Sequence, residues 1–121
     1  MTQEPAAARY MLIFRGGAVS RQDVSPAVLQ AHLAKWYAWS DELRREGRRN
    51  AGTPLANGGK AVRGHERAVT DGPYAESKDL VTGAMVIYAA SLDDAVDVAR
   101  RCPTYEFDGS VEVRPVHDDE G

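Results

Sequence analysis

The stretch TDGPYAESK, residues 70–78, separates two apolar, strand-like runs of this chain. It combines a turn former, a proline, an aromatic ring, two carboxylates and an amine. A β-hairpin usually closes with two residues such as Asn-Gly or Asp-Gly, so nine polar-rich residues are more than a turn requires. Long polar loops on a rigid scaffold are where binding groups tend to lie. The stretch is therefore the first candidate for a functional loop.

Strand-like runs lie on both sides of this loop. Those at 10–14 and 81–90 are apolar and predict interior strands of a sheet, the first of them covered on both faces. Residues 60–70 predict a short hairpin that turns at Gly64-His65-Glu66. Residues 111–114 alternate apolar and charged, which predicts a strand with one wet face. The crossing 47–59 is rich in Gly, Pro and Asn and has room for one extra short strand.

The first helix is expected from about residue 26 to 46. Ser25 supplies an N-cap and Pro26 the first helical position. Four apolar side chains at helical spacing form the stripe expected to face the core, namely Leu29, Leu33, Trp36 and Leu43. His32 and Trp39 lie together on one shoulder of that stripe. The arginines between 44 and 49 are expected to be a solvated helix end, with anion binding as the alternative.

A second helix begins with the capping-box-like sequence Ser91-Leu92-Asp93-Asp94 and ends before Cys102-Pro103. The order of elements is then β-α-β-β-α-β. It predicts an α+β fold, a ferredoxin-like antiparallel sheet with two helices on one face. The other face of that sheet would carry apolar side chains with no helix over them. Two such faces packed together would remove them from water, so a homodimer is expected.

The composition describes one domain of ordinary size, expected from 9 to 116 with flexible tails at 1–8 and 117–121. A net charge of −3 and a pI near 5.6 give no basic surface for nucleic acid. The single cysteine, Cys102, excludes an internal disulfide. Neither a membrane span nor a signal peptide is recognisable, so a cytoplasmic protein is expected. No metal-ligand spacing, phosphate loop or dinucleotide motif occurs, so no cofactor is expected.

The stretch 70–78 resembles the signature of the DGPF-domain branch of the YCII-related family. Tyr74 stands where the branch name has Phe, which keeps the ring and adds a hydroxyl, and residues 81–85 read VTGAM instead of the more usual Gly-Gly followed by an aromatic. Other landmarks agree in order and spacing across residues 9–116. They are Arg9-Tyr10-Met11-Leu12, the His32…Trp36…Trp39…Leu43 segment, Val62-Arg63-Gly64, Ser91-Leu92-Asp93-Asp94-Ala95 and Gly109-Ser110-Val111-Glu112-Val113-Arg114-Pro115.

The resemblance implies a dimeric α/β barrel, built when the sheets of two subunits pack together. It also implies a His–Asp pair in a cleft, because the wider family is associated with such a pair and with at least one dehydrochlorinase-like activity. Members of the branch are often encoded near extracytoplasmic-function sigma factors, which makes a sigma factor an alternative partner.

His32 is the strongest candidate for a general base or acid, because histidine is the side chain that ionises nearest neutral pH. Asp71 would orient its imidazole or accept a proton itself. The ordinary alternatives are a helix-edge histidine without a task and a turn aspartate that bonds backbone amides. The cleft wall and ligand contacts would come from Trp36, Trp39, Tyr74, Glu76 and Lys78. For these side chains the alternatives are core packing of the rings and surface solvation of the charges.

The leading interpretation is a cofactor-free acid–base enzyme, a lyase, dehydrochlorinase or isomerase that acts on a small organic molecule. In it, the loop 71–78 forms one wall of a cleft whose other wall carries His32. The competing interpretation is a binding or regulatory module that uses the same cleft without turnover, or that docks a sigma factor. A third is a loop that serves only dimer assembly.

Overall fold

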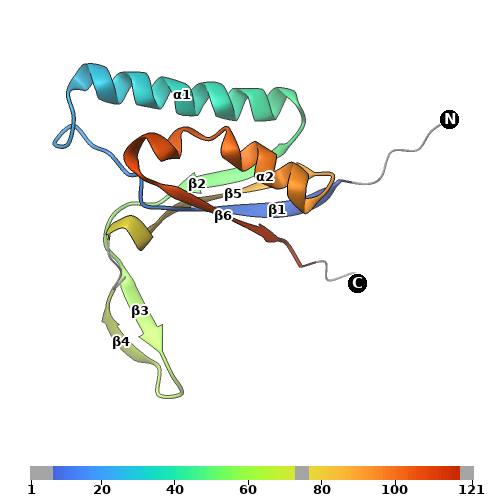
Figure 1. Ribbon diagram of the computed structural model, residues 1–121. Coiled ribbons are helices and arrows are strands. Elements are labelled where there is room, and N and C mark those ends of the chain that lie inside the picture. Colours follow the sequence, from blue (N-terminus) through green and yellow to red (C-terminus); the bar gives the residue numbers. More distant parts are fainter. Residues whose placement is uncertain (1–6, 73–76, 118–121) are drawn as a thin grey trace.

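The computed structural model describes residues 7–72 and 77–117, which form a four-stranded antiparallel sheet, two α-helices and a separate hairpin. The sheet has the order β2-β5-β1-β6, from β1 (Ala8–Arg15), β2 (Arg49–Pro54), β5 (Val81–Ala89) and β6 (Ser110–Pro115). Figure 1 shows α1 (Pro26–Arg45) and α2 (Leu92–Arg100) together on one face of this sheet. The predicted ferredoxin-like α+β fold is confirmed.

The hairpin of β3 (Lys60–Arg63) and β4 (Ala68–Asp71) forms a second, two-stranded sheet. Figure 1 shows it extending from the main sheet on the side away from the helices. The short strand considered for the 47–59 crossing is β2, which pairs antiparallel with β5 at the edge of the main sheet. The hairpin is therefore an insertion between two strands of the ferredoxin-like pattern.

Among the described residues, β1 is covered on only one face, although its apolar sequence predicted cover on both. Tyr10, Leu12 and Phe14 are buried, while Met11 and Ile13 between them are half-buried. The alternation follows because successive side chains of a strand point to opposite faces. We call the helix-free face the open sheet face, and its central apolar side chains are Met11, Ile13, Ala84, Val86 and Tyr88.

α1 turns only part of the predicted stripe toward the core, since Trp36 and Leu43 face it as expected but Leu33 does not. Its core-facing side chains are His32, Trp36, Trp39 and Leu43, whereas Leu33 is 42% exposed. These four positions have helical spacing too, and they bring both indoles against Phe14, with ring centroids 5.4 and 6.2 Å apart. Aromatic rings bury more apolar area than leucines do and gain from edge-to-face contact. The stripe that contains both tryptophans therefore faces the sheet.

Both helix starts form as predicted. The Ser25 hydroxyl accepts from the backbone N–H of Val28 at 3.2 Å, and the Ser91 hydroxyl accepts from that of Asp94 at 3.1 Å.

The arginine cluster is a solvated helix end only in part: Arg44 and Arg45 are exposed at the last turn of α1 as expected, whereas Arg48 is half-buried. Arg48 donates to both carboxylate oxygens of Asp94, at 2.9 and 3.2 Å, and so ties the end of α1 to the start of α2. This guanidinium, followed by the backbone N–H of Ala90, holds the pKa of Asp94 below its usual range. Arg48 therefore has a structural role.

Cys102 is buried, and burial raises the pKa of its thiol to about 12. A thiol in that state stays protonated at neutral pH and is not a nucleophile. In the part of the chain that the structure describes, no helix has both the length and the apolar character needed to cross a membrane.

Candidate functional site

The predicted loop residues are placed only in part. Tyr74 and Glu76 lie outside the described residues. Lys78 belongs to the short 3-10 helix η1 (Ser77–Asp79), and its side chain is exposed. Asp71 ends β4 on the hairpin, where its carboxylate is 81% exposed and accepts from the Lys60 ammonium at 2.6 Å. Asp71 is thus engaged within its own hairpin.

His32 lies in a closed group of side chains between α1 and the 3-10 helix η2 (Pro103–Phe107). Only 3% of His32 is exposed. Its Nδ1 is 2.8 Å from the Glu106 carboxylate, and the indole N–H of Trp36 donates to its Nε2 at 3.0 Å. The Phe107 ring packs edge-to-face on the imidazole, with centroids 4.6 Å apart. We call His32, Trp36, Glu106 and Phe107 the histidine cluster.

The partners of His32 fix its tautomer. An indole N–H can only donate, so Nε2 is the unprotonated, accepting nitrogen. Nδ1 therefore carries the hydrogen and donates it to Glu106. This is a neutral imidazole oriented by a carboxylate, the arrangement of an oriented base. However, Nε2, the nitrogen that would accept a proton, already accepts the hydrogen bond from the indole N–H of Trp36.

Glu106 links the histidine cluster to the surface of α1. Its second carboxylate oxygen accepts from Lys35, and its first from His32. The hydrogen bond from Lys35 first, and that from His32 second, lower the pKa of Glu106 from its usual range. Glu106 is therefore ionised at neutral pH and holds α1 against η2.

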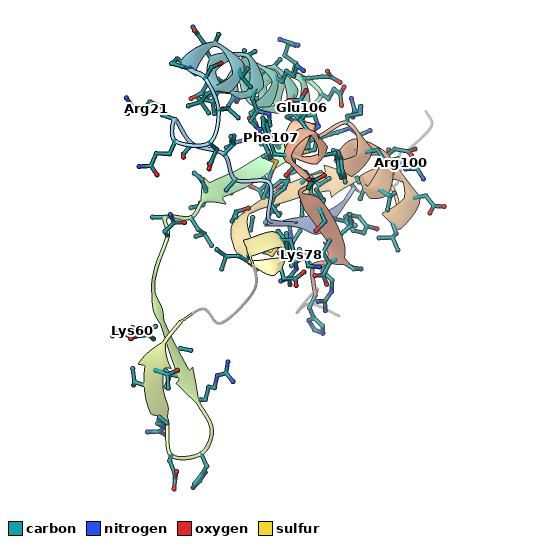
Figure 2. The ribbon with its side chains drawn as sticks, turned by 60° about the vertical axis from the view of Figure 1, so that its left-hand side comes forward. Arg21, Lys60, Lys78, Arg100, Glu106 and Phe107 are labelled. Atoms are coloured by element: carbon teal, nitrogen blue, oxygen red, sulfur yellow. The ribbon has the colours of Figure 1, made fainter. Side chains whose placement is uncertain are left out.

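The structure does not bring His32 and Asp71 together within one chain. Both nitrogens of the imidazole have other partners, and Asp71 is paired on the hairpin. Figure 2 labels Glu106 beside α1 and Lys60 on the hairpin at the far end of the molecule. A His32–Asp71 pair across two subunits stays a prediction. Trp36 and Trp39 belong to the core around Phe14, where Trp39 also donates to the backbone carbonyl of Val98 at 3.3 Å.

A cavity of about 330 Å³ does lie beside the signature loop, immediately after its last described residue. We call it the loop pocket. It is formed by the end of β1, the start of β5 and the crossing after β2, and its lining residues are Arg15, Leu55, Ala56, Asn57, Gly58, Asp79, Leu80, Val81 and Thr82. Its size is at the lower end of the ~300–1,000 Å³ range of small-molecule sites.

The wall of the loop pocket is held by close backbone contacts. Gly16, with φ of 63°, packs so closely that a Cβ there would lie 2.8 Å from the backbone oxygen of Lys78. The N–H of Gly16 donates to the carbonyl of Leu80 at 2.9 Å. The Thr82 hydroxyl lies 3.3 Å from the carbonyl oxygen of Phe14 and 3.1 Å from that of Gly16, within hydrogen-bond reach of both. The end of β1 and the residues after the signature are therefore fixed to each other.

Arg15 is the cationic group of the loop pocket. Its guanidinium donates to the backbone carbonyl of Asp79 and to the carboxylate of Glu112, both at 3.2 Å. A guanidinium has five N–H donors, so three of them have no partner among the described residues. Asn57 adds an amide and Asp79 a carboxylate, while Leu55 and Leu80 add apolar surface. The pocket offers both donors and acceptors around an apolar floor.

A second hollow, of about 410 Å³, follows the outer side of α1. Its lining is mostly apolar, from Pro26, Leu29, Leu33, Ala34 and Tyr37, with Arg21 and Gln30 at its border. It lacks the set of convergent polar groups that orients a small ligand.

The residues that the sequence did not single out are Glu106, Arg15, Asn57, Asp79 and Thr82. Glu106 is separated from His32 by 74 positions, and its sequence neighbours carry no motif. Asp79 directly follows the signature, and Arg15 ends the first strand, so their placement at strand ends was the available signal.

The described residues define a small ferredoxin-like α+β domain with one closed polar cluster and one open polar pocket. The chain matches the YCII-related domain over residues 8–118, and it belongs to the YCII-related family. An uncharacterised protein of Rhizobium meliloti (strain 1021) is 46% identical over 52 residues, a stretch that covers 42% of this chain and 42% of that relative. Membership of the DGPF branch rests on the signature residues and stays a prediction.

Proposed function

We propose that this protein binds a small, carbonyl-bearing organic molecule in the loop pocket. The observation that carries the proposal is a cavity directly beyond the signature loop that is lined by Arg15, whose guanidinium keeps N–H groups without a partner among the described residues. Polar groups with unused hydrogen-bonding capacity at the wall of a cavity are what gives a ligand its orientation. The apolar floor from Leu55 and Leu80 suits the carbon skeleton of such a molecule.

The charges around the pocket indicate which carbonyl compounds fit best. Arg15 is already paired with Glu112, and Asp79 adds a second carboxylate to the wall. A neutral amide can accept from Arg15 and donate to Asp79, whereas a carboxylate is repelled by both acidic groups. We therefore expect benzamide to bind more tightly than benzoate, and benzyl alcohol, which has no carbonyl, to bind most weakly.

This proposal is tested by equilibrium titration of the protein with benzamide, benzoate and benzyl alcohol. We expect Arg15→Met to weaken benzamide binding at least ~10-fold, a loss of about 1.4 kcal/mol. Arg44→Met is the control, since Arg44 is another ion-paired arginine, with Asp41 as its partner, and lies on α1 away from the loop pocket. Equal benzamide binding by wild type and Arg15→Met would remove the loop pocket as the binding site.

We propose a homodimer through the open sheet face as the assembled form. The support is physical: the side chains of Met11, Ile13 and Val86 form an apolar centre that neither α1 nor α2, the two α-helices of the described residues, covers. An uncovered apolar sheet face is a common interface in symmetric dimers. No group of described residues favours a sigma factor over a second copy of the chain, so that partner is not proposed.

An acid–base reaction at His32 is the second candidate function. The observation in its favour is the carboxylate-oriented imidazole with an unprotonated Nε2. A substrate could give its proton to Nε2 only after the indole of Trp36 has moved away. Catalysis would therefore need the histidine cluster to open, with Asp71 of a second subunit as the remaining candidate for a further acid.

Diethylpyrocarbonate, which modifies accessible unprotonated imidazoles, tests this candidate. If the cluster opens, Trp36→Phe should raise the modification rate of His32 at least ~10-fold, because the donor that blocks Nε2 is gone. His65 and His117, both exposed, serve as internal references in the same sample. A His32 that stays unmodified in Trp36→Phe would assign the cluster a structural role alone.

A further inference from the structure

The apolar side of the β3–β4 hairpin has no partner among residues 7–72 and 77–117. In the described part of the chain, every residue of its two strands is exposed except the half-buried Ala61. Val62 and Val69 lie directly opposite each other in the register, and they are 64% and 63% exposed. A two-stranded hairpin alone is marginally stable in water. An exposed pair of β-branched side chains on such a hairpin is a candidate contact surface.

The hairpin leaves the main sheet as a closed unit. The N–H of Gly72 donates to the carbonyl of Gly59 at 3.2 Å, and the Lys60–Asp71 ion pair lies next to it. Figures 1 and 2 both show the hairpin extending away from the helices, on the side of the open sheet face. A body that covers the open sheet face would therefore lie beside the hairpin as well.

The charges of this surface fit a second copy of the chain. The hairpin carries both signs, with Lys60, Arg63 and Arg67 against Glu66 and Asp71. The border of the open sheet face is mixed in the same way, with Glu112 between Arg15 and Arg114. A two-fold interface places the same patch on both subunits, so it needs both signs to be self-complementary. A nucleic acid or an anionic membrane would instead require a surface of one sign.

We propose that the β3–β4 hairpin is an arm that grips a second copy of this chain and packs its Val62–Val69 side against it. The inference rests on the proposed homodimer through the open sheet face. The crossing that forms the loop pocket, Leu55 to Gly58, leads directly into the arm. The partner subunit that the arm grips would thus close the open side of the loop pocket, and the ligand would be held at the subunit interface.

The test is the dimer dissociation constant of the full-length protein, measured by sedimentation equilibrium. We expect the double variant Val62→Asp with Val69→Asp to weaken the dimer at least ~100-fold relative to wild type. Val28→Asp is the matched control, because Val28 is an exposed valine, 47% exposed, on α1 at the opposite face of the sheet. It should leave the constant within ~3-fold of wild type.

A second variant guards against an effect of misfolding. Because Gly59 and Gly72 are hydrogen-bonded, the chain can be joined between them with residues 60–71 removed and the four-stranded sheet intact. This variant should keep the circular dichroism spectrum of its helices and lose dimer affinity to the same extent. Unchanged dimer affinity in both variants would overturn the arm while leaving the sheet-face dimer standing. A monomeric wild type would overturn the arm and the homodimer together. Met11→Asp, on the open sheet face, should disrupt the sheet-face contact and leave the arm itself unchanged.

Discussion

The histidine cluster and the loop pocket lie in the same small domain, but they differ in how far their polar groups are hydrogen-bonded. In the cluster, both nitrogens of His32 have partners, and only 3% of the residue is exposed. In the pocket, Arg15 keeps three N–H groups without a partner among the described residues, at the wall of a cavity. A buried and satisfied polar group stabilises a fold, whereas spare hydrogen-bonding capacity beside a cavity serves a ligand. Histidine, the residue type most often used in acid–base catalysis, therefore need not mark the binding site.

The largest expected effect is on stability, at the cluster. His32→Ala should lower the free energy of unfolding by about 2–4 kcal/mol, because it leaves a cavity and an unpaired indole N–H on Trp36. Urea unfolding measures this change, and His65→Ala, in the exposed turn of the hairpin, is the control with an expected change within about 0.5 kcal/mol. If both variants lose equally little, the cluster does not hold the fold together.

A pH dependence should follow from Glu106. Its pKa in the folded protein lies below the ordinary value of 4.5, so the unfolded chain binds its proton more readily than the folded one. The stabilisation by its bonds to Lys35 and His32 is then fully present above pH 4.5 and is lost as the pH falls through the lowered value. Unfolding curves of wild type and Glu106→Gln should differ at neutral pH and converge in acid. Curves that stay equally far apart at all pH values would contradict the assignment.

A smaller effect on stability, but a clear one on binding, is expected at the loop pocket. Arg15→Lys keeps the charge but loses the planar fork, so benzamide affinity should fall at least ~10-fold. The free energy of unfolding should change by only about 0–1 kcal/mol, since the Arg15–Glu112 pair is partly exposed. Calorimetric titration and urea unfolding of the same preparation separate the two quantities. Unfolding losses as large as those of His32→Ala would place Arg15 among the structural residues.

The smallest effect is expected at Asp71. Its carboxylate is 81% exposed and its pair with Lys60 lies at the surface, so Asp71→Asn should change the unfolding free energy by about 0–0.5 kcal/mol. Thermal unfolding of wild type and variant at one protein concentration is sufficient. A loss above ~2 kcal/mol would show that Asp71 makes a buried contact, such as one with His32 of a second subunit.

The sequence predicted the fold well where local signals were strong. The two helix starts at Ser25 and Ser91 and the strand at 81–90 have caps or β-branched runs that act over a few residues. The core-facing stripe of α1 was predicted only in part: Trp36 and Leu43 face the core as expected, whereas Leu33 does not. Two stripes share helical spacing, and only packing against Phe14 decides between them. The separation of β3 and β4 from the main sheet likewise depends on pairing between distant strands, which a local pattern does not report.

The sites were less predictable than the fold. The signature at 70–78 does lead to a cavity, but the polar groups that line it come from β1, the crossing after β2 and β5. Glu106 contacts His32 across 74 positions, and one sequence carries no signal of such a contact. The sequence indicated a notable histidine, His32, and a notable loop at 70–78, and both are real features. That they lie apart within one chain depends on the tertiary fold, which the sequence pattern does not report.

Binding at the loop pocket and binding at the histidine cluster can be compared directly in one sample. A two-dimensional amide NMR spectrum of the wild-type protein, titrated with benzamide, resolves the backbone N–H groups of Asn57 and Thr82 and the indole N–H groups of Trp36 and Trp39. We expect the signals of Asn57 and Thr82 to shift in a saturable way while both indole signals stay in place. A saturable shift of the Trp36 indole with unmoved Asn57 and Thr82 signals would contradict this expectation and assign binding to the histidine cluster.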